Sequence, residues 1–565
     1  MMRKVLIFLL LFASVAGVRA QSPLVERTYI ATDRDVYLAG ETVWCSAFCV
    51  DAATGRLSSL SSTAFLELHS ARGKALEAKV ALAEGRGGGN FELPRNLPTG
   101  NYRLIAYTAL NRGERGYQYD GLCSKTISVY NIFSRERVEE GVKVVETLPA
   151  APAAPAEAGE LTLSLPAVFK AGEGLSLQIE SPSEATLCVS VSRADALPRN
   201  DNPTIGEFVA ALPSVGRPDY SEQILPDYEG EVIRGRIVGF NPESRESLAG
   251  KYAFLSAPGN QSDIYASRID SAGNLIFFTG NIYGQKELIT EIEGIDQKLN
   301  CHVELESPFT AEGVTPPAPL PLCASVAEVL SIRAATMQIE RRFMADTLLE
   351  YLPRRDNVLF EDNVARRYHL DDYTRFPLIR ELFIEFIREV TVRERAGERT
   401  IHVSIREGES STNLSRQPAL VLLDGVPVFD HGKILDYDPL LVEDICVYPH
   451  VYFISGRQFD GIVNLVTYKH TLPAMQFGSN VRVVNFQGVS YPAAYRREAP
   501  SGDSAPTYPD YRQTAYWHPL VYIPVGGRVV LEGLLPDYPG DFILIVEGLT
   551  SDGRPLRAER SFSVK

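Results

Sequence analysis

The sequence has little of what enzymes and membrane-spanning proteins usually show. After the first twenty residues it contains no apolar run of about 18 residues, so we expect no transmembrane helix. The eight histidines never form HExxH, and Gly-x-Ser-x-Gly is missing, which disfavours zinc peptidases and α/β-hydrolases. The glycine run at residues 85–89 lacks the lysine of a phosphate loop and fits a hairpin turn over residues 87–90 better. The sequence therefore predicts no enzyme, and no catalytic, cofactor-binding or metal-binding residues.

Cysteine is also scarce and scattered. The count is odd, and the positions do not form a disulfide framework: Cys45, Cys49, Cys123, Cys188, Cys301, Cys323 and Cys446. On one face of a strand, Cys45 and Cys49 would lie about 13 Å apart, too far to bridge. We interpret both as small core residues, since no second ligand pair for zinc lies nearby.

Positive charge is in short supply. The formal net charge is −15, and without Arg3, Lys4 and Arg19 it would be −18. An acidic chain without a lysine-rich block disfavours nucleic acid and anionic membrane surfaces as partners.

The first twenty residues have the pattern of a secretory signal. Arg3 and Lys4 precede an apolar core at residues 5–12, and Val18-Arg19-Ala20 supplies a small-residue cleavage site. A buried N-terminal helix is the alternative. We expect residues 1–20 to be removed and the mature chain to lie in the periplasm or at the outer-membrane surface.

What the sequence has in abundance is strand chemistry. Its 26 Tyr and 25 Phe favour strands, and its length allows roughly three to five domains. Tyr37-x-Ala-Gly-Glu41-x-Val43 returns as Phe169-x-Ala-Gly-Glu173-x-Leu175. A recurring unit predicts a β-sandwich used more than once, within a mainly β, multidomain fold of macroglobulin-like or immunoglobulin-like sandwiches, a helical linker and a small α/β domain.

The first module is expected at residues 21–148. A turn-rich stretch from Asp33 leads into the apolar run 43–50, and Leu-Pro-Thr-Gly-Asn-Tyr opens an alternating strand at residues 97–108. These two stretches resemble the macroglobulin domain of the alpha-macroglobulin family, as found in secreted proteins of the Bacteroidota. No cysteine stands in the Gly-Cys-Gly-Glu-Gln context of that family's thioester, so covalent trapping of a protease is not supported.

Further boundaries follow from composition. Residues 149–159 are a Pro/Ala linker, and residues 160–228 are expected to form a second macroglobulin-like sandwich, with an uncertain end because 194–228 lack periodicity. Short strands with frequent turns at residues 229–310 resemble the regulatory-like domain found beside some carboxypeptidases. Residues 324–400 read as helical, with a capping box at Ser325–Glu328, a first helix ending at Pro353 and a second opened by Pro377.

Residues 401–470 resemble the plug domain of TonB-dependent receptors. The matching pieces are LLDGVPV, DPLLVEDICVY and GIVNLVTYK. Because only 97 residues follow Tyr468, a barrel of about 22 strands cannot fit, so the resemblance implies a plug-like domain without a pore. Residues 509–565 are expected to form a C-terminal β domain; Tyr516 and Trp517 there are either partner contacts or, as we favour, core anchors.

The densest polar group is Asp424, Asp430, His431, Asp436 and Asp438, which we interpret as turn chemistry rather than an acid/base or metal site. Likewise, Arg341, Arg342, Glu381 and Glu385 are expected on solvated helix faces. The leading functional hypothesis is a non-enzymatic exported protein of the cell envelope that binds an envelope protein or extended peptide by strand addition. The alternatives are a macroglobulin-type peptidase inhibitor, with a bait loop at 194–228 or 496–508, and an accessory protein of a TonB-dependent receptor.

Overall fold

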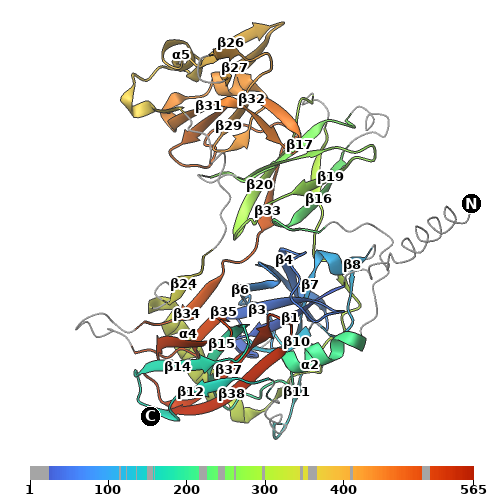
Figure 1. The fold of residues 1–565 in the computed structure, drawn as a ribbon, viewed down its shortest axis with the longest axis vertical. Coiled ribbons are helices and arrows are strands. Elements are labelled where there is room, and N and C mark those ends of the chain that lie inside the picture. The colour runs from blue at the N-terminus through green and yellow to red at the C-terminus, as the bar shows by residue number, and fades with distance from the viewer. Residues whose placement is uncertain are drawn as a thin grey trace, which may run out of the picture. The chain divides into compact units, whose positions relative to one another are not determined.

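A computed structural model of the chain describes residues 25–113, 116–122, 124–134, 137–148, 157, 159–214, 226–239, 248–259, 263–295, 300–343, 348–353, 366–407, 411–498 and 509–565. The expected signal at 1–20 and most of the linker at 149–159 lie outside these residues. The chain divides into two compact units, and each is described by itself. Unit 1 comprises residues 1–226, 309–352 and 492–565, and unit 2 comprises 227–308 and 353–491. The predicted mainly β, multidomain sandwich architecture is confirmed (Figure 1).

The first sandwich of unit 1 follows the prediction for the start of the chain. One sheet has the order β1 (Glu26–Thr32), β3 (Thr42–Asp51), β6 (Arg86–Glu92). The other has the order β2 (Val36–Leu38), β10 (Ser124–Tyr130), β7 (Gly100–Thr108), β4 (Thr63–Ser70), β5 (Gly73–Ala81). A small sheet of β8 (Arg112–Gly113), β9 (Gly116–Gln118) and β22 (Ala311–Glu312) adjoins them. Alternating β7 residues enter the core, namely Tyr102, Leu104 and Ala106, with both Cys45 and Cys49 beside them.

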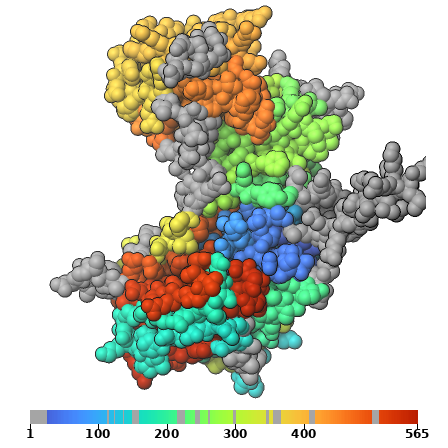
Figure 2. All heavy atoms as spheres, viewed as in Figure 1, coloured from blue at the N-terminus to red at the C-terminus, as the bar shows by residue number. Residues whose placement is uncertain are grey.

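The second sandwich repeats this strand order one for one. Its smaller sheet is β12 (Thr162–Ser164), β14 (Gly174–Glu180), β36 (Arg528–Leu534), matching β1-β3-β6. Its larger sheet begins β13 (Val168–Phe169), β38 (Pro555–Val564), β37 (Gly540–Thr550), β15 (Ala185–Ala194), β35 (Thr514–Ile523), matching β2-β10-β7-β4-β5. β34 (Ala493–Arg496) and β24 (Leu349–Tyr351) extend it. In Figure 2 the red C-terminal segment lies directly against the teal strands that follow residue 160.

This arrangement corrects two of the predicted domains. Residues 160–228 do not complete a sandwich, and residues 509–565 are not a separate domain, because their strands share two sheets and one core. In the chain, the two halves are separated between β15 and β35. The equivalent strands of the first sandwich, β4 and β5, are joined only by a short turn at Ala71–Arg72. Residues 195–513, with the whole of unit 2, are therefore inserted into a hairpin of the second sandwich.

The predicted helical segment 324–400 is also divided. Its first helix, α4 (Ala327–Phe343), begins from a 3-10 turn and belongs to unit 1, and residues 344–347 after it lie outside the described residues. Ahead of it, β22 pairs with β9, and β23 (Pro321–Leu322) pairs with β11 (Lys143–Val144), so the Pro-rich stretch packs along the first sandwich. α2 (Ile205–Ala211), inside the stretch without periodicity, begins with a Thr204–Glu207 capping box.

Unit 2 holds two sheet-containing parts. The first has sheets β19 (Asn274–Phe278), β16 (Val232–Val238), β21 (His302–Leu305) and β18 (Ile264–Arg268), β17 (Tyr252–Ser256), β20 (Gln285–Ile292), β33 (Arg482–Gln487). The predicted boundary at 310 omitted β33, which pairs along β20 from nearly 200 residues away.

The second part of unit 2 contains the stretch at residues 401–470, and further strands and helices lie around it. Its main sheet has the order β25 (Arg366–His369), β31 (Val442–Ile454), β32 (Arg457–Thr467), β29 (Leu420–Leu423), β30 (Val426–Pro427). β26 (Val390–Arg395), β27 (Glu398–Glu407) and β28 (Ser411–Leu414) form a second sheet, and α5 (Ile379–Glu385) and α6 (His431–Leu435) share its core. This core begins near Leu370, so the boundary predicted at 401 was too late. Among the described residues, no helix combines the length and apolarity needed to cross a membrane.

The glycine run was assigned to the wrong local structure. The turn lies at Glu84–Gly85, both with positive φ, while Gly87, Gly88 and Gly89 belong to β6. A Cβ on Gly87 would lie 2.0 Å from the carbonyl oxygen of Ala81, and one on Gly88 would lie 2.5 Å from Cβ of Pro519. These glycines therefore permit close packing of strands rather than a turn.

Candidate functional site

The repeated sequence signature builds the same turn in both sandwiches of unit 1. Glu41 accepts a hydrogen bond from the backbone N–H of Leu38 at 2.8 Å, and Glu173 accepts one from Lys170 at 2.6 Å. The residue before each positive-φ glycine donates its N–H at or just after the last strand of its own sandwich, Ala39 to Tyr130 of β10 and Ala171 to Lys565 after β38, both at 2.9 Å. The shared motif therefore encodes a sandwich corner, not a binding site.

In the first sandwich the corner also ties the two sandwiches together. The carboxylate of Asp33 accepts from the Trp44 N–H at 3.0 Å, from the Tyr37 hydroxyl at 2.7 Å and from the Thr514 hydroxyl of the second sandwich at 2.5 Å. From α4, Arg333 donates to the Val36 carbonyl at 3.1 Å. Arg341, predicted to be solvated, instead bonds Gly40 and Glu92. Charge-assisted bonds of this kind fix the geometry around the corner.

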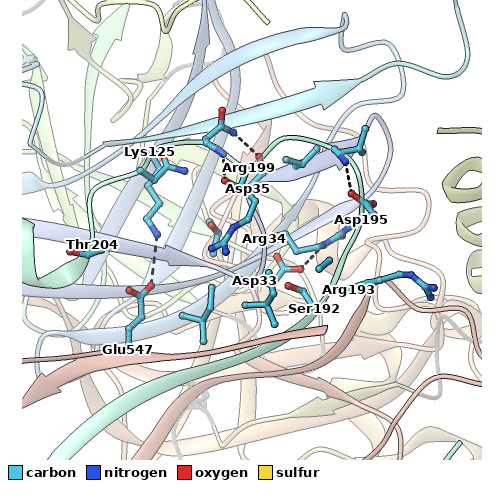
Figure 3. A pocket seen from close by; sticks show the side chains of 18 of the residues that line it. Asp33, Arg34, Asp35, Lys125, Ser192, Arg193, Asp195, Arg199, Thr204 and Glu547 are labelled. Atoms are coloured by element: carbon cyan, nitrogen blue, oxygen red, sulfur yellow. Dashed lines mark hydrogen bonds and ion pairs between the residues drawn. The ribbon is translucent and has the colours of Figure 1, made fainter. Parts of the chain in front are cut away.

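Beside this corner, unit 1 contains a charged cavity of about 140 Å³ (Figure 3). Its walls come from β1 and the turn after it, β10, the loop between β15 and α2, α4, β37 and β38. Six cationic and four acidic side chains line it: Arg34, Lys125, Arg193, Arg199, Arg333, Arg557, Asp33, Asp35, Asp195 and Glu547. Ile543 and Ile545 on β37 give it an apolar side.

Most of these charges are paired within the protein. Arg34 contacts Asp33 at 3.2 Å and Glu41 at 3.3 Å, and Arg199 contacts Glu559 at 3.0 Å. The Tyr29 hydroxyl donates to Glu547 at 3.0 Å, and burial followed by the Glu547 charge raises the pKa of Tyr29 well above its usual value.

Asp35 lines the same cavity and is half-buried. Burial raises the pKa of its carboxyl, although the Asn200 N–H donates to it at 2.6 Å. Burial disfavours the ionised form of this carboxyl.

Sequence reasoning identified Asp33 and Asp35 only as turn residues and missed the cavity. Its other walls lie far away in the chain, and no local pattern marks Lys125, Arg333 or Glu547. Only the topology of the split sandwich brings them together.

The polar group predicted in unit 2 does not converge on an open site. Asp424 is buried and accepts from Thr467 and Leu472, while Asp430 and Asp438 cap short helices at Gly432 and Leu440. Asp436 pairs with Arg399. Each carboxylate therefore serves the local structure, and among the residues that the structure describes no three His, Cys, Asp or Glu side chains could hold a metal ion.

His431, the remaining member, is a core histidine. Its Nδ1 accepts the backbone N–H of Ile401 at 2.9 Å, and the residue is only 7% exposed. Burial, followed by the charge of His402, lowers the pKa of His431 to about 4. The imidazole is therefore neutral over the physiological range.

Tyr516 and Trp517 are core residues, as favoured from the sequence. Tyr516 belongs to the core of the second sandwich. Trp517 is fully buried in a cluster shared by both sandwiches, together with Tyr29, Trp44 and Phe208.

β36 is an edge strand of the second sandwich, and its outward carbonyls at Glu532 and Leu534 accept from Arg496 and Arg512. All seven residues pair with β14 on one side. The Leu534 N–H points the other way, donating to the Arg497 carbonyl at 2.8 Å, so the even-numbered residues direct their backbone groups outward. At Val530 no described residue bonds these groups, and its side chain is 48% exposed. The matching strand β6 of the first sandwich instead packs against Pro519 of β35.

Comparison with known proteins supports part of the sequence reading. A family described as the MG2 domain matches residues 27–119. No curated protein matches the sequence. The solved structures that are similar include an Escherichia coli alpha-2-macroglobulin activated by porcine elastase (9% identity, 96% of this chain and 44% of that chain, TM-score 0.24). They also include a Salmonella alpha-2-macroglobulin reacted with methylamine (10%, 96% and 40%, 0.23) and a Yersinia pseudotuberculosis adhesin (13%, 51% and 60%, 0.14).

This chain thus spans less than half the length of those macroglobulins. Scores this low do not establish a shared overall fold. Together with the strand order of the first sandwich, the family match shows that the chain carries a macroglobulin-type MG2 domain at residues 27–119.

Proposed function

We propose that this chain is a non-enzymatic, exported protein of the cell envelope that binds an extended segment of a partner protein by strand addition to β36. The observation that carries the proposal is the outward-facing edge at Val530, where backbone groups and an exposed apolar side chain occur together. Strand addition uses such backbone groups for affinity and alternate side chains for specificity. Arg528 and Glu532, exposed on either side of Val530, would select the partner's side chains.

A proline substitution can block strand addition at β36 without disturbing the fold. Val530→Pro removes an N–H that points outward, so the β14 ladder is kept, and edge strands tolerate proline at such positions. Peptides selected from a display library for binding to the wild-type mature chain should bind Val530→Pro at least about tenfold more weakly, a loss of about 1.4 kcal/mol. Fluorescence polarisation with the selected peptides measures this.

Val530→Thr is the matched control, because it keeps the backbone N–H and a β-branched side chain. It should retain most of the binding. Equal peptide affinity for the wild type and Val530→Pro would contradict strand addition at β36.

A peptidase inhibitor lacking a thioester is the second candidate, favoured by the MG2 match. Of its two possible bait loops, residues 215–225 and 499–508 lie outside the described residues, while 195–214 form α2 and part of the cavity wall. Limited proteolysis tests it: cleavage within either loop, with the protease retained on size exclusion, would favour inhibition over strand addition.

A further inference from the structure

Lys125 occupies an unusual position in the charged cavity of unit 1. It is 9% exposed, and its nearest acidic partner is Glu547 with an Nζ–Oε1 distance of 3.8 Å. The ammonium also lies 5.1 Å from the centre of the Tyr29 ring. A distance of 3.8 Å is too long for a hydrogen bond, so the ion pair leaves the three N–H donors of Lys125 without an acceptor among the described residues.

The neighbouring cations donate hydrogen bonds within the protein, although Nε of Arg333 has no partner among the described residues. Arg34 donates to Asp33, Arg333 donates to the Val36 carbonyl, and Arg193 donates to the carbonyls of Tyr538 and Pro539. An anionic acceptor in the cavity would supply charge-assisted hydrogen bonds to this ammonium of Lys125. The other lining cations are held by carboxylates or carbonyls, including Glu41 and Glu559 beside the cavity, so Lys125 is the cation best placed to receive a negative group of a ligand.

The apolar wall and the small volume of the cavity restrict the rest of such a ligand. Phe542, Leu544 and Val546 of β37 enter the sandwich core, which leaves Ile543 and Ile545 facing the cavity. A volume of about 140 Å³ has room for a ligand of a few heavy atoms. We propose that this cavity binds a small organic carboxylate, with its carboxylate on Lys125 and its short apolar part against Ile543 and Ile545. This site is separate from the β36 edge and does not depend on strand addition.

Butyrate is a suitable probe, and butylammonium is its counterpart of opposite charge. Isothermal titration of the full mature chain should show butyrate binding and no butylammonium binding. Lys125→Met, which keeps the length of the side chain but removes the charge, should weaken butyrate binding by at least about tenfold. Lys286→Met, at a lysine paired with Asp263 in unit 2, is the control and should bind butyrate like the wild type.

A second variant keeps the test decisive if Lys125→Met does not fold. Ile545→Phe fills the apolar side without altering charge and should also abolish butyrate binding. A short peptide ending in a free carboxylate distinguishes a chain terminus from a small molecule, and it should not bind. The proposal is overturned if butyrate fails to bind the wild type, if it binds Lys125→Met equally well, or if only the peptide binds.

Discussion

Replacing Trp517 tests whether this residue is a core anchor or a partner contact. Its ring is fully buried where the two sandwiches of unit 1 meet, and its Nε1–H has no hydrogen-bond acceptor among the described residues. Trp517→Ala should therefore lower the free energy of unfolding by about 4 kcal/mol through lost burial and the cavity left behind. Trp517→Phe loses volume but no hydrogen bond, so it should cost only about 1–2 kcal/mol.

Tryptophan fluorescence in urea is a selective assay for this prediction. The chain has only two tryptophans, and Trp44 belongs to the same cluster, with its ring centre 5.2 Å from that of Tyr495. In both variants Trp44 therefore reports on the junction of the sandwiches. A loss of less than about 1 kcal/mol in Trp517→Ala would refute the core assignment, as would lost partner binding with unchanged stability.

Three further predictions concern the corner, the edge strand and the buried histidine. Glu41→Ala should destabilise unit 1 by about 3–5 kcal/mol, because it leaves the buried Arg333 and its neighbour Arg34 without their shared carboxylate. Glu173→Ala, at the equivalent but exposed corner, should cost only about 1 kcal/mol in the same urea titration. Val529→Pro should destabilise the second sandwich by about 1–3 kcal/mol, because the N–H of Val529 faces β14 and removing it leaves a β14 carbonyl unpaired. If calorimetry showed the same stability for Val529→Pro and Val530→Pro, the assigned orientation of β36 would be wrong. The pKa of His431 is about 4 in the folded chain, against 6.5 in the unfolded chain, so the unfolded chain takes up a proton first as the pH falls. The free energy of unfolding of unit 2 should therefore fall by about 3 kcal/mol between pH 6.5 and 4. Urea unfolding followed by circular dichroism should show a flatter pH profile for His431→Asn.

The sequence predicted local structure better than it predicted which strands share a sheet. The echo of Glu41 in Glu173 identified two sandwich corners, because turn chemistry acts over three or four residues. It could not reveal that β14 pairs with β36, since strand pairing across an insertion leaves no local signal. The glycine run was mistaken for a turn because close packing against Pro519 depends on a segment far along the chain.

For the candidate sites, too, the sequence predicted what depends on neighbouring residues and not what depends on distant segments. Interpreting Asp430 and Asp438 as structural carboxylates required only partners two residues along, whereas Asp424 is held by Thr467 and Leu472 from a distant segment. The Lys125 cavity combines segments from both ends of the chain, so its recognition required the fold.

Strand addition at β36 is tested most directly by amide hydrogen exchange, with and without a selected peptide. We expect exchange at Val530 and Glu532, whose N–H groups point outward, to slow when the peptide binds, while exchange at Val529 and Leu531, already paired with β14, changes little. Unchanged exchange along β36 in the peptide-bound protein would contradict it.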